Sequence, residues 1–378
     1  MPSPRSGPPY HMTEMIAAEP ALAERILARL GATGSGGDGS AARLAAAIRA
    51  AADAGGPIVV TGCGTSEHGA LGVVEILRDA MRSVGLSGPG PVAAQAFEAA
   101  LDPQHGGLLI GVSHEGSTSA TNRAIEAARA NGATTAMLTV SERSPGAALA
   151  DIVLATAELD QSWCHTVGYL SPIVAAVAAG AALRGGTDGA AAIRASLAAG
   201  ADDVGAIESA AGELAKATHL IVIASGADRP AGRELTLKIE EAAWIPSAFR
   251  DLETFLHGHI PATGPDTGLI LVLADPAARP ERLDRARKAL AAARVLGIRA
   301  AAIIAADASA GLEASLTPAG RIVVPDAADL PGPVAALIGT AVPLQLLTER
   351  IARARGTNPD PIRRDDPRYL AASAAAEG

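Results

Sequence analysis

The sequence has few cysteines, few aromatic residues and no long unbroken apolar stretch. Its two cysteines, Cys63 and Cys164, provide no disulfide framework and fit a reducing cytoplasm. Aromatic residues make up 2% of the chain and the net charge is -9, so neither stacking platforms nor a basic surface favours a nucleic-acid partner. Residues 1–20 contain no apolar core of a signal peptide, and no run reaches the roughly 18–20 uninterrupted apolar residues of a membrane helix. We therefore expect a cytoplasmic protein that binds neither nucleic acid nor membrane, with the Ala-rich stretch Val174–Leu183 as a buried helix.

Short apolar, β-branched runs alternate with helical stretches along most of the 378 residues. This alternation predicts parallel sheets with helices on both faces. The interval between the first two runs is similar in the two halves, which indicates two similar doubly wound, flavodoxin-like lobes. The runs expected to be strands are 58–60, 108–112, 135–140 and 151–156 in the first half, and 220–224, 269–274, 300–305 and 321–326 in the second.

The pattern divides the chain into four parts. Residues 1–45 are expected to form a helical arm, with a helix over His11–Leu30 interrupted at Glu19-Pro20, followed by a flexible linker at Gly31–Ser40. The first lobe is expected over 46–200 and the second over 201–355. The polar tail, 356–378, is expected either to be disordered or to lie over a site.

Two Gly- and hydroxyl-rich loops follow predicted strands of the first lobe and lead into helices. They are TGCGTS (Thr61–Ser66) and SHEGST (Ser113–Thr118). Helix N-termini at the carboxyl ends of parallel strands present free N–H groups and positive potential, which suits an anion. The alternative is that the Ser and Thr side chains only cap helices. Neither loop has the spacing of a dinucleotide fingerprint or a P-loop, so no cofactor is expected.

Four segments, taken together and in order, resemble the isomerase module of glucosamine-6-phosphate synthase and its relatives in the sugar-isomerase (SIS) family. They are HMTEMIAAEPAL, TGCGTSEHGAL, SHEGSTSAT and LKIEEAAWIPSAFRDLETFLHGH. The resemblance covers nearly the whole chain from His11 onward. It implies two tandem SIS lobes that bind a small sugar substrate.

The resemblance also implies which residues contact the sugar. In the family, hydroxyl residues of the two loops bind the sugar phosphate, and a later loop contacts sugar hydroxyls. This chain departs at the third position of the second loop, where Glu115 replaces a small hydroxyl residue and would repel a phosphate. The expected substrate-binding residues are Gly64, Thr65, Ser66, Ser113, His114, Glu115, Ser117, Thr118, His165 and Thr166.

By the same resemblance, Glu241 matches the carboxylate that moves a proton between C1 and C2, and Lys238 matches a nearby catalytic lysine. Judged by spacing alone, Lys238 and Glu241 fit a solvated salt-bridge face. His257 matches the histidine that opens the sugar ring from a second subunit, which implies a homodimer. His257 and His259 form a His-x-His pair without further ligands, so no metal is expected. Ala372 stands where the family has a tail lysine.

The resulting prediction is an aldose–ketose isomerase that acts, through an enediol, on a hexose carrying an anionic group such as a phosphate or sulfonate. One alternative is a deglycase or deaminase of an amino- or aminoacyl-sugar phosphate, which needs the same proton transfer. The other is a sugar-binding regulator without catalysis. Fold alone does not separate the three.

Overall fold

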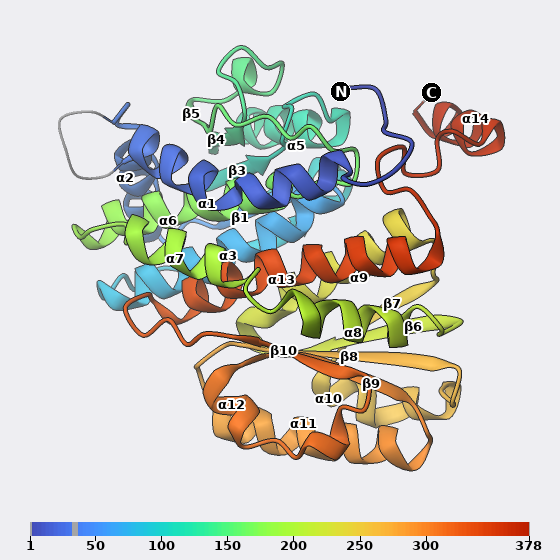
Figure 1. The fold of residues 1–378 in the computed structure, drawn as a ribbon. Coiled ribbons are helices and arrows are strands. Elements are labelled where there is room, and N and C mark those ends of the chain that lie inside the picture. The colour runs from blue at the N-terminus through green and yellow to red at the C-terminus, as the bar shows by residue number, and fades with distance from the viewer. Residues whose placement is uncertain (1, 32–36, 378) are drawn as a thin grey trace.

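The computed structural model describes residues 2–31 and 37–377 and contains two parallel five-stranded sheets (Figure 1). The strand order is β2-β1-β3-β4-β5 in the first sheet and, read from the opposite edge, β7-β6-β8-β9-β10 in the second. Both lobes thus have the same doubly wound order, which confirms the predicted α/β fold class. The strands are β1 (Ile58–Gly62), β2 (Val92–Gln95), β3 (Leu108–Val112), β4 (Thr134–Thr139), β5 (Ile152–Ala155), β6 (His219–Ala224), β7 (Ser247–Asp251), β8 (Thr267–Leu273), β9 (Arg299–Ala305) and β10 (Gly320–Val324).

The strands β2 and β7 were not expected from the sequence, and each is an edge strand at the equivalent position of its lobe. All residues of β1, the neighbour of β2, are buried, and so are all but the first residue of β6, the neighbour of β7, as expected for strands covered by helices on both faces. By contrast, no residue of β2 or β7 is fully buried. Edge strands with half-exposed, mixed side chains lack the continuous apolar run that identifies a central strand.

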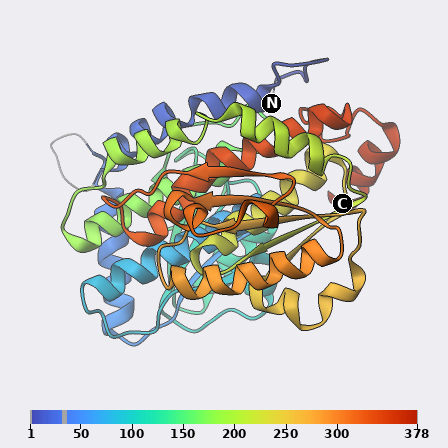
Figure 2. The same ribbon diagram turned by 60° about the horizontal axis from the view of Figure 1, so that its bottom comes forward.

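Helices cover both faces of each sheet and fill the space between the lobes (Figures 1 and 2). The long helix α13 contacts α8 and α9 of the second lobe and α3, α6 and α7 of the first. Helices α3 and α9 also contact each other, so both lobes share one apolar core. The helices are α1 (His11–Leu30), α2 (Ser40–Asp53), α3 (Thr65–Ser83), α4 (Ala96–Leu101), α5 (Ser119–Ala130), α6 (Val167–Arg184), α7 (Ala190–Ala199), α8 (Val204–Leu214), α9 (Arg229–Ala243), α10 (Leu252–Thr254), α11 (Arg279–Val295), α12 (Ala306–Ala310), α13 (Gly332–Arg355) and α14 (Pro367–Glu377).

The arm differs from the prediction at Pro20. Helix α1 runs without a break from His11 to Leu30 with Pro20 inside it, so the predicted interruption was wrong. A proline removes one helical N–H and usually kinks a helix. Here α1 packs along α6 and α7, and this packing stabilises the continuous helix. Residues 32–36 of the predicted linker lie outside the described residues.

Two helices, α6 and α13, are long and apolar enough by length and composition to cross a membrane. In each of them 89% of the apolar window is buried inside the protein. They are core helices of the fold, as was expected for the Ala-rich stretch Val174–Leu183.

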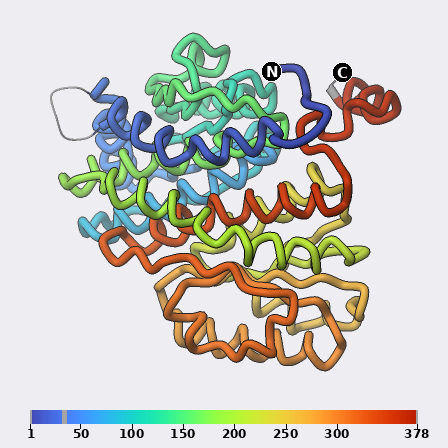
Figure 3. The backbone as a smooth tube through the Cα atoms, viewed as in Figure 1, coloured from blue at the N-terminus to red at the C-terminus, as the bar shows by residue number. Residues whose placement is uncertain are grey.

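The tail lies beside the N-terminal segment (Figure 3). Asn358 Nδ2 donates to the Arg5 carbonyl oxygen at 2.6 Å, and Asp360 accepts from the backbone N–H groups of Arg5 and His11. Beyond these contacts the chain forms α14, a helix that the sequence did not suggest. The boundaries drawn at 45, 200 and 355 stay predictions.

Candidate active site

The first loop makes a sharp turn between β1 and α3. Gly64 adopts φ 56° and ψ -127°, a conformation that side chains with a Cβ disfavour. Its carbonyl oxygen accepts from the N–H groups of Glu67 and His68, which begins α3 at Thr65. A Cβ on Gly62 would lie 2.7 Å from the backbone of Ser66. The two glycines therefore allow the hydroxyl side chains of this loop to lie at the carboxyl end of the sheet.

The second loop folds back on itself between β3 and α5. The Ser113 and Thr118 hydroxyl oxygens lie 3.1 Å apart, and the Gly116 N–H donates to the Ser113 carbonyl oxygen at 3.1 Å. Gly116 has φ 68°, and a Cβ there would meet Ser144 Oγ at 2.2 Å. The loop is thus packed tightly onto the segment around Ser144.

A cleft of about 200 Å³ brings the two loops together with residues that lie far away in the sequence. Glu241, from the second lobe, lines the same cleft as the loops of the first lobe. Gly64 and Thr166 do not line it, since Gly64 forms the turn and Thr166 is buried at the start of α6. The cleft also includes Cys63 and Gly168, which the sequence did not suggest. Its lining residues are Cys63, Thr65, Ser66, Ser113, His114, Glu115, Ser117, Thr118, His165, Gly168 and Glu241.

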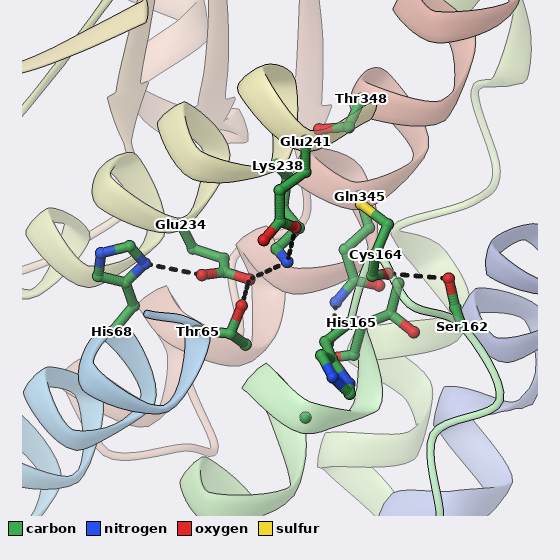
Figure 4. Close-up of polar contacts among 12 residues, drawn as sticks. Thr65, His68, Ser162, Cys164, His165, Glu234, Lys238, Glu241, Gln345 and Thr348 are labelled. Carbon is green, nitrogen blue, oxygen red and sulfur yellow. Dashed lines mark hydrogen bonds and ion pairs between the residues drawn. The ribbon is translucent and has the colours of Figure 1, made fainter. Parts of the chain in front are cut away.

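Lys238 lies directly behind Glu241 on α9 (Figure 4). Its Nζ donates to Glu241 Oε2 at 2.5 Å and lies 3.7 Å from Glu234 Oε1. The side chains of Lys238 and Glu234 are fully buried, whereas that of Glu241 is 24% exposed. Burial alone would lower the pKa of Lys238, but Glu241 and Glu234 outweigh it and raise this pKa well above its usual range. The three residues therefore form a buried charged cluster, and the solvated salt-bridge face is excluded.

Glu234 also connects the two lobes. Its Oε2 lies 2.8 Å from His68 Nδ1, and its Oε1 accepts from the Thr65 hydroxyl at 3.3 Å, both on α3 (Figure 4). Burial would raise the pKa of Glu234, but Lys238 and His68 lower it below its usual value. A carboxylate without water keeps its charge only beside such partners. These contacts fix α9, and with it Glu241, against the first loop.

On the opposite wall, Asp160 organises the segment that precedes α6. This fully buried carboxylate accepts from the N–H groups of Ser162, Thr166 and Gly168. It also lies 3.5 Å from His165 Nδ1. No sequence motif pointed to Asp160, and only its tertiary contacts identify it.

His114 is held neutral beside Asp160. Its Nε2 accepts from the Asp160 backbone N–H at 2.9 Å, so the ring proton of neutral His114 is on Nδ1. Burial lowers the pKa of His114 to about 4, with the neighbouring His165 lowering it further and Asp160 opposing. Near neutral pH this ring adds no positive charge to the cleft.

His257 lies apart from the cleft within one chain. Its side chain is 67% exposed, and Nε2 lies 2.7 Å from Glu253 Oε1. His259 Nδ1 accepts from Arg250 at 3.2 Å. Among the residues that the structure describes, no group of three or more His, Cys, Asp or Glu side chains could hold a metal ion.

The tail reaches Glu241 from the other side. A second pocket, of about 380 Å³, lies between the end of α9 and the tail and is also lined by Glu241. Arg363 and Arg364 of the tail lie over the rings of Trp244 and Trp163, the two tryptophans of the chain. Ala372 is exposed on α14.

Residues 51–184 match the family model of the SIS domain. The first lobe is thus similar to a SIS domain. The second lobe repeats its strand order, and the two lobes together form a tandem SIS fold. No curated protein matches the sequence.

Solved structures with the same two-lobed architecture support this assignment of the fold. The C-terminal domain of glucosamine-fructose-6-phosphate aminotransferase from Francisella tularensis has a TM-score of 0.79 at 17% identity, covering 95% of this chain and 99% of that one. Tagatose-6-phosphate ketose/aldose isomerase from Escherichia coli has a TM-score of 0.68 at 18% identity, covering 95% and 97%. Glucosamine-6-phosphate deaminase from Thermotoga maritima has a TM-score of 0.62 at 16% identity, covering 93% and 97%. At these identities the comparison establishes the shared fold.

Proposed function

We propose that this SIS protein interconverts the aldose and ketose forms of a hexose that carries an anionic group. The observation that carries the proposal is the place of Glu241. It is a partly exposed carboxylate that lines a cleft of hydroxyl-bearing loops, and a buried ammonium fixes one of its oxygens. Two of the structural neighbours are named as a ketose/aldose isomerase and a sugar phosphate deaminase, and this agrees with proton transfer at a sugar carbon.

In this mechanism Glu241 takes the proton from C2 of the open-chain aldose and returns it to C1 of the enediol, while O1 gains a proton as the enediol forms and O2 loses its hydroxyl proton as the ketose forms. A carboxylate in this role must stay deprotonated between turnovers and point at the sugar. Lys238 supplies the second condition, the orientation of the carboxylate, through its 2.5 Å contact. Because Lys238 does not line the cleft, we assign it to holding Glu241 and not to direct contact with the sugar.

The test is proton exchange in D₂O, followed by NMR, with fructose and glucose and with their 6-phosphates, 2-amino derivatives and sulfonated analogues. We expect the C2 proton of an aldose substrate to exchange and the ketose to accumulate. Glu241→Gln should reduce the exchange rate about 10²–10⁴-fold, the usual contribution of a general base.

Glu75→Gln is the matched control. Glu75 is 25% exposed and pairs with Arg78 three residues later, whereas Glu241 is 24% exposed and pairs with Lys238 three residues earlier. Since Glu75 does not line the cleft, the Glu75→Gln variant should exchange the sugar proton at the wild-type rate. If sugars bind to the wild type without any exchange, the protein is a sugar-binding regulator. If exchange is accompanied by release of ammonia or an amine, it is a deaminase or deglycase.

A further inference from the structure

The aldose–ketose step moves two protons, and Glu241 accounts for only one of them. Glu241 carries a proton from C2 to C1, with one of its carboxylate oxygens held by Lys238. The second proton moves between oxygens, because the O1 carbonyl must gain a proton and the O2 hydroxyl must lose one. The step therefore calls for another acid–base group in the cleft, one that can give a proton to O1 and take one from O2.

His165 lines the cleft on the wall that Asp160 organises. The side chain of His165 is 28% exposed, but its Nδ1 atom is buried and lies 3.5 Å from Asp160 Oδ2. The accessible edge of the ring is therefore that of Nε2. A Cβ on Gly168 would lie 3.2 Å from both Cβ and Nδ1 of His165, so the ring packs directly against the backbone of Gly168. The ring is thus held between Gly168 and Asp160, with Nε2 on its accessible side.

Asp160 makes His165 suitable for carrying a proton. Burial would raise the pKa of Asp160, but His165, His114 and a backbone N–H group lower it below its usual value. Among the residues that the structure describes, His165 is the one basic side chain within ion-pair distance of the Asp160 carboxylate. A buried carboxylate stabilises a positive partner, here the imidazolium form of the ring. A movement of about 0.5 Å would bring the two atoms within hydrogen-bond distance, and catalytic contacts often tighten when substrate binds.

The other side chains that line the cleft are less suited to this transfer. His114 keeps its proton on Nδ1 and uses Nε2 to accept from a backbone N–H, and its pKa is lowered to about 4. Burial raises the pKa of the Cys63 thiol, so this group gives up its proton reluctantly. Glu115 is exposed, and an exposed carboxyl group holds no proton near neutral pH. An imidazole, by contrast, both gives and takes protons in this range.

We propose that His165 is the second acid–base residue of the site. Its imidazolium gives the Nε2 proton to O1 while Glu241 takes the proton from C2, which turns the C1=O1 double bond into the C1=C2 bond of the enediol. The neutral imidazole then takes the proton of the O2 hydroxyl while Glu241 protonates C1, which forms the C2=O2 bond of the ketose. Both side chains end the turnover as they began it. The inference rests on the proposed function, since it completes the same reaction.

His165→Gln tests this role by proton exchange in D₂O, with the hexose that the wild type converts. At saturating sugar, both the exchange of the C2 proton and the formation of ketose should fall about 10²–10⁴-fold, the usual contribution of an acid–base group. His219→Gln is the matched control. His219 is partly exposed like His165, but it begins β6 at the far end of the sheet and does not line the cleft. This variant should keep the wild-type rate.

Calorimetric titration separates proton transfer from simple binding. The same hexose is titrated into Glu241→Gln and into the double variant Glu241→Gln/His165→Gln, which should both bind without turnover. The loss of one hydrogen bond should weaken the affinity by less than about tenfold. If the affinity falls further while His165→Gln keeps the wild-type rate at saturating sugar, His165 is only a binding contact and the proposal is overturned.

Chemical rescue separates an acid–base role from a structural one. In His165→Ala the space of the imidazole ring is vacated, so imidazole added to the solution should restore part of the exchange rate. The same addition should leave the Glu241→Gln variant inactive. If imidazole restores nothing in His165→Ala, the residue acts through the shape of the cleft wall, which also overturns the proposal.

The proposed function fails in a different readout. If the wild type exchanges, Glu241→Gln does not, and His165→Gln exchanges at the wild-type rate, the isomerase assignment stands and the role of His165 falls. If no hexose exchanges protons in the wild type, the isomerase assignment falls, and the role of His165 falls with it.

Discussion

His114 illustrates how a single buried side chain sets a pH dependence. Its pKa is about 4 in the folded protein and near 6.5 in an unfolded chain. Between these values the unfolded state binds more protons, so the free energy of unfolding falls as the pH drops from about 6.5 towards 4. The shift corresponds to about 3 kcal/mol, present in full above the upper value and lost below the lower one.

We expect His114→Gln to flatten this part of the pH profile. Urea unfolding at a series of pH values between about 7 and 4 would measure it, with His105→Gln as the control, because His105 is exposed. If His114→Gln and wild type lose stability in parallel over this range, His114 is not the group responsible.

Among single residues, the sequence pointed to those of the candidate site that belong to a motif and not to those outside one. The loop residues Thr65, Ser113 and Thr118 and the helix residue Glu241 were expected together, and one cleft contains them. Asp160 belongs to no motif, and its surroundings arise only when the loop at His114 and the segment before α6 fold together. The roles of all these residues in binding or catalysis stay predictions.

At the scale of elements, the position of the second loop depends on the backbone of Gly116. Gly116 has φ 68° and no room for a Cβ, which would lie 2.2 Å from Ser144 Oγ and 2.5 Å from Ser144 Cβ. Gly132, after α5, has φ 79° but nothing within 4 Å of its Cβ position. Alanine variants at these two glycines therefore separate two costs in the free energy of unfolding. Both variants pay for a left-handed alanine, but only Gly116→Ala also places a Cβ against Ser144.

We expect Gly132→Ala to lower the free energy of unfolding by about 1–2 kcal/mol, the cost of a left-handed alanine. Gly116→Ala should cost about 1–3 kcal/mol more, since the loop must also move. Because that movement displaces Ser113 and Ser117, Gly116→Ala should also reduce the sugar exchange rate in D₂O, while Gly132→Ala should not. Equal losses of stability in the two variants would contradict the packing described for the loop.

The elements themselves were predictable where their side chains were buried on both faces. The central strands β1, β3, β8 and β9 have continuous apolar runs and were expected close to their observed bounds. The edge strands β2 and β7 were missed because their partly exposed residues form no β-branched apolar run, whereas the equally exposed edge strand β10 keeps Ile322–Val324. Helix α14 was missed because charges and prolines precede it, and its side chains pack little against the rest of the protein.

At the scale of the whole molecule, the candidate site depends on both lobes at once. The loops come from the first lobe and Glu241 from the second, and the contacts of Glu234 with Thr65 and His68 join them. His257, a predicted catalytic residue, does not line this cleft. It is 67% exposed and held by Glu253 and Arg285 at the surface of the second lobe. An exposed residue can complete the cleft of a second subunit, as expected from the family resemblance.

Mixed dimers would test this arrangement. Co-expressing Glu241→Gln and His257→Ala chains with different affinity tags allows the mixed species to be isolated. If His257 acts in the partner's site, one of the two sites contains both an intact Glu241 and an intact His257, so the mixed dimer should have about half of the wild-type exchange rate. A mixed dimer of Glu241→Gln and Lys238→Met chains is the control, since both changes affect the same part of the site and neither site is intact. If His257 acts within its own subunit, the first mixture should be as inactive as the control. If no mixed species can be isolated, the predicted homodimer is wrong.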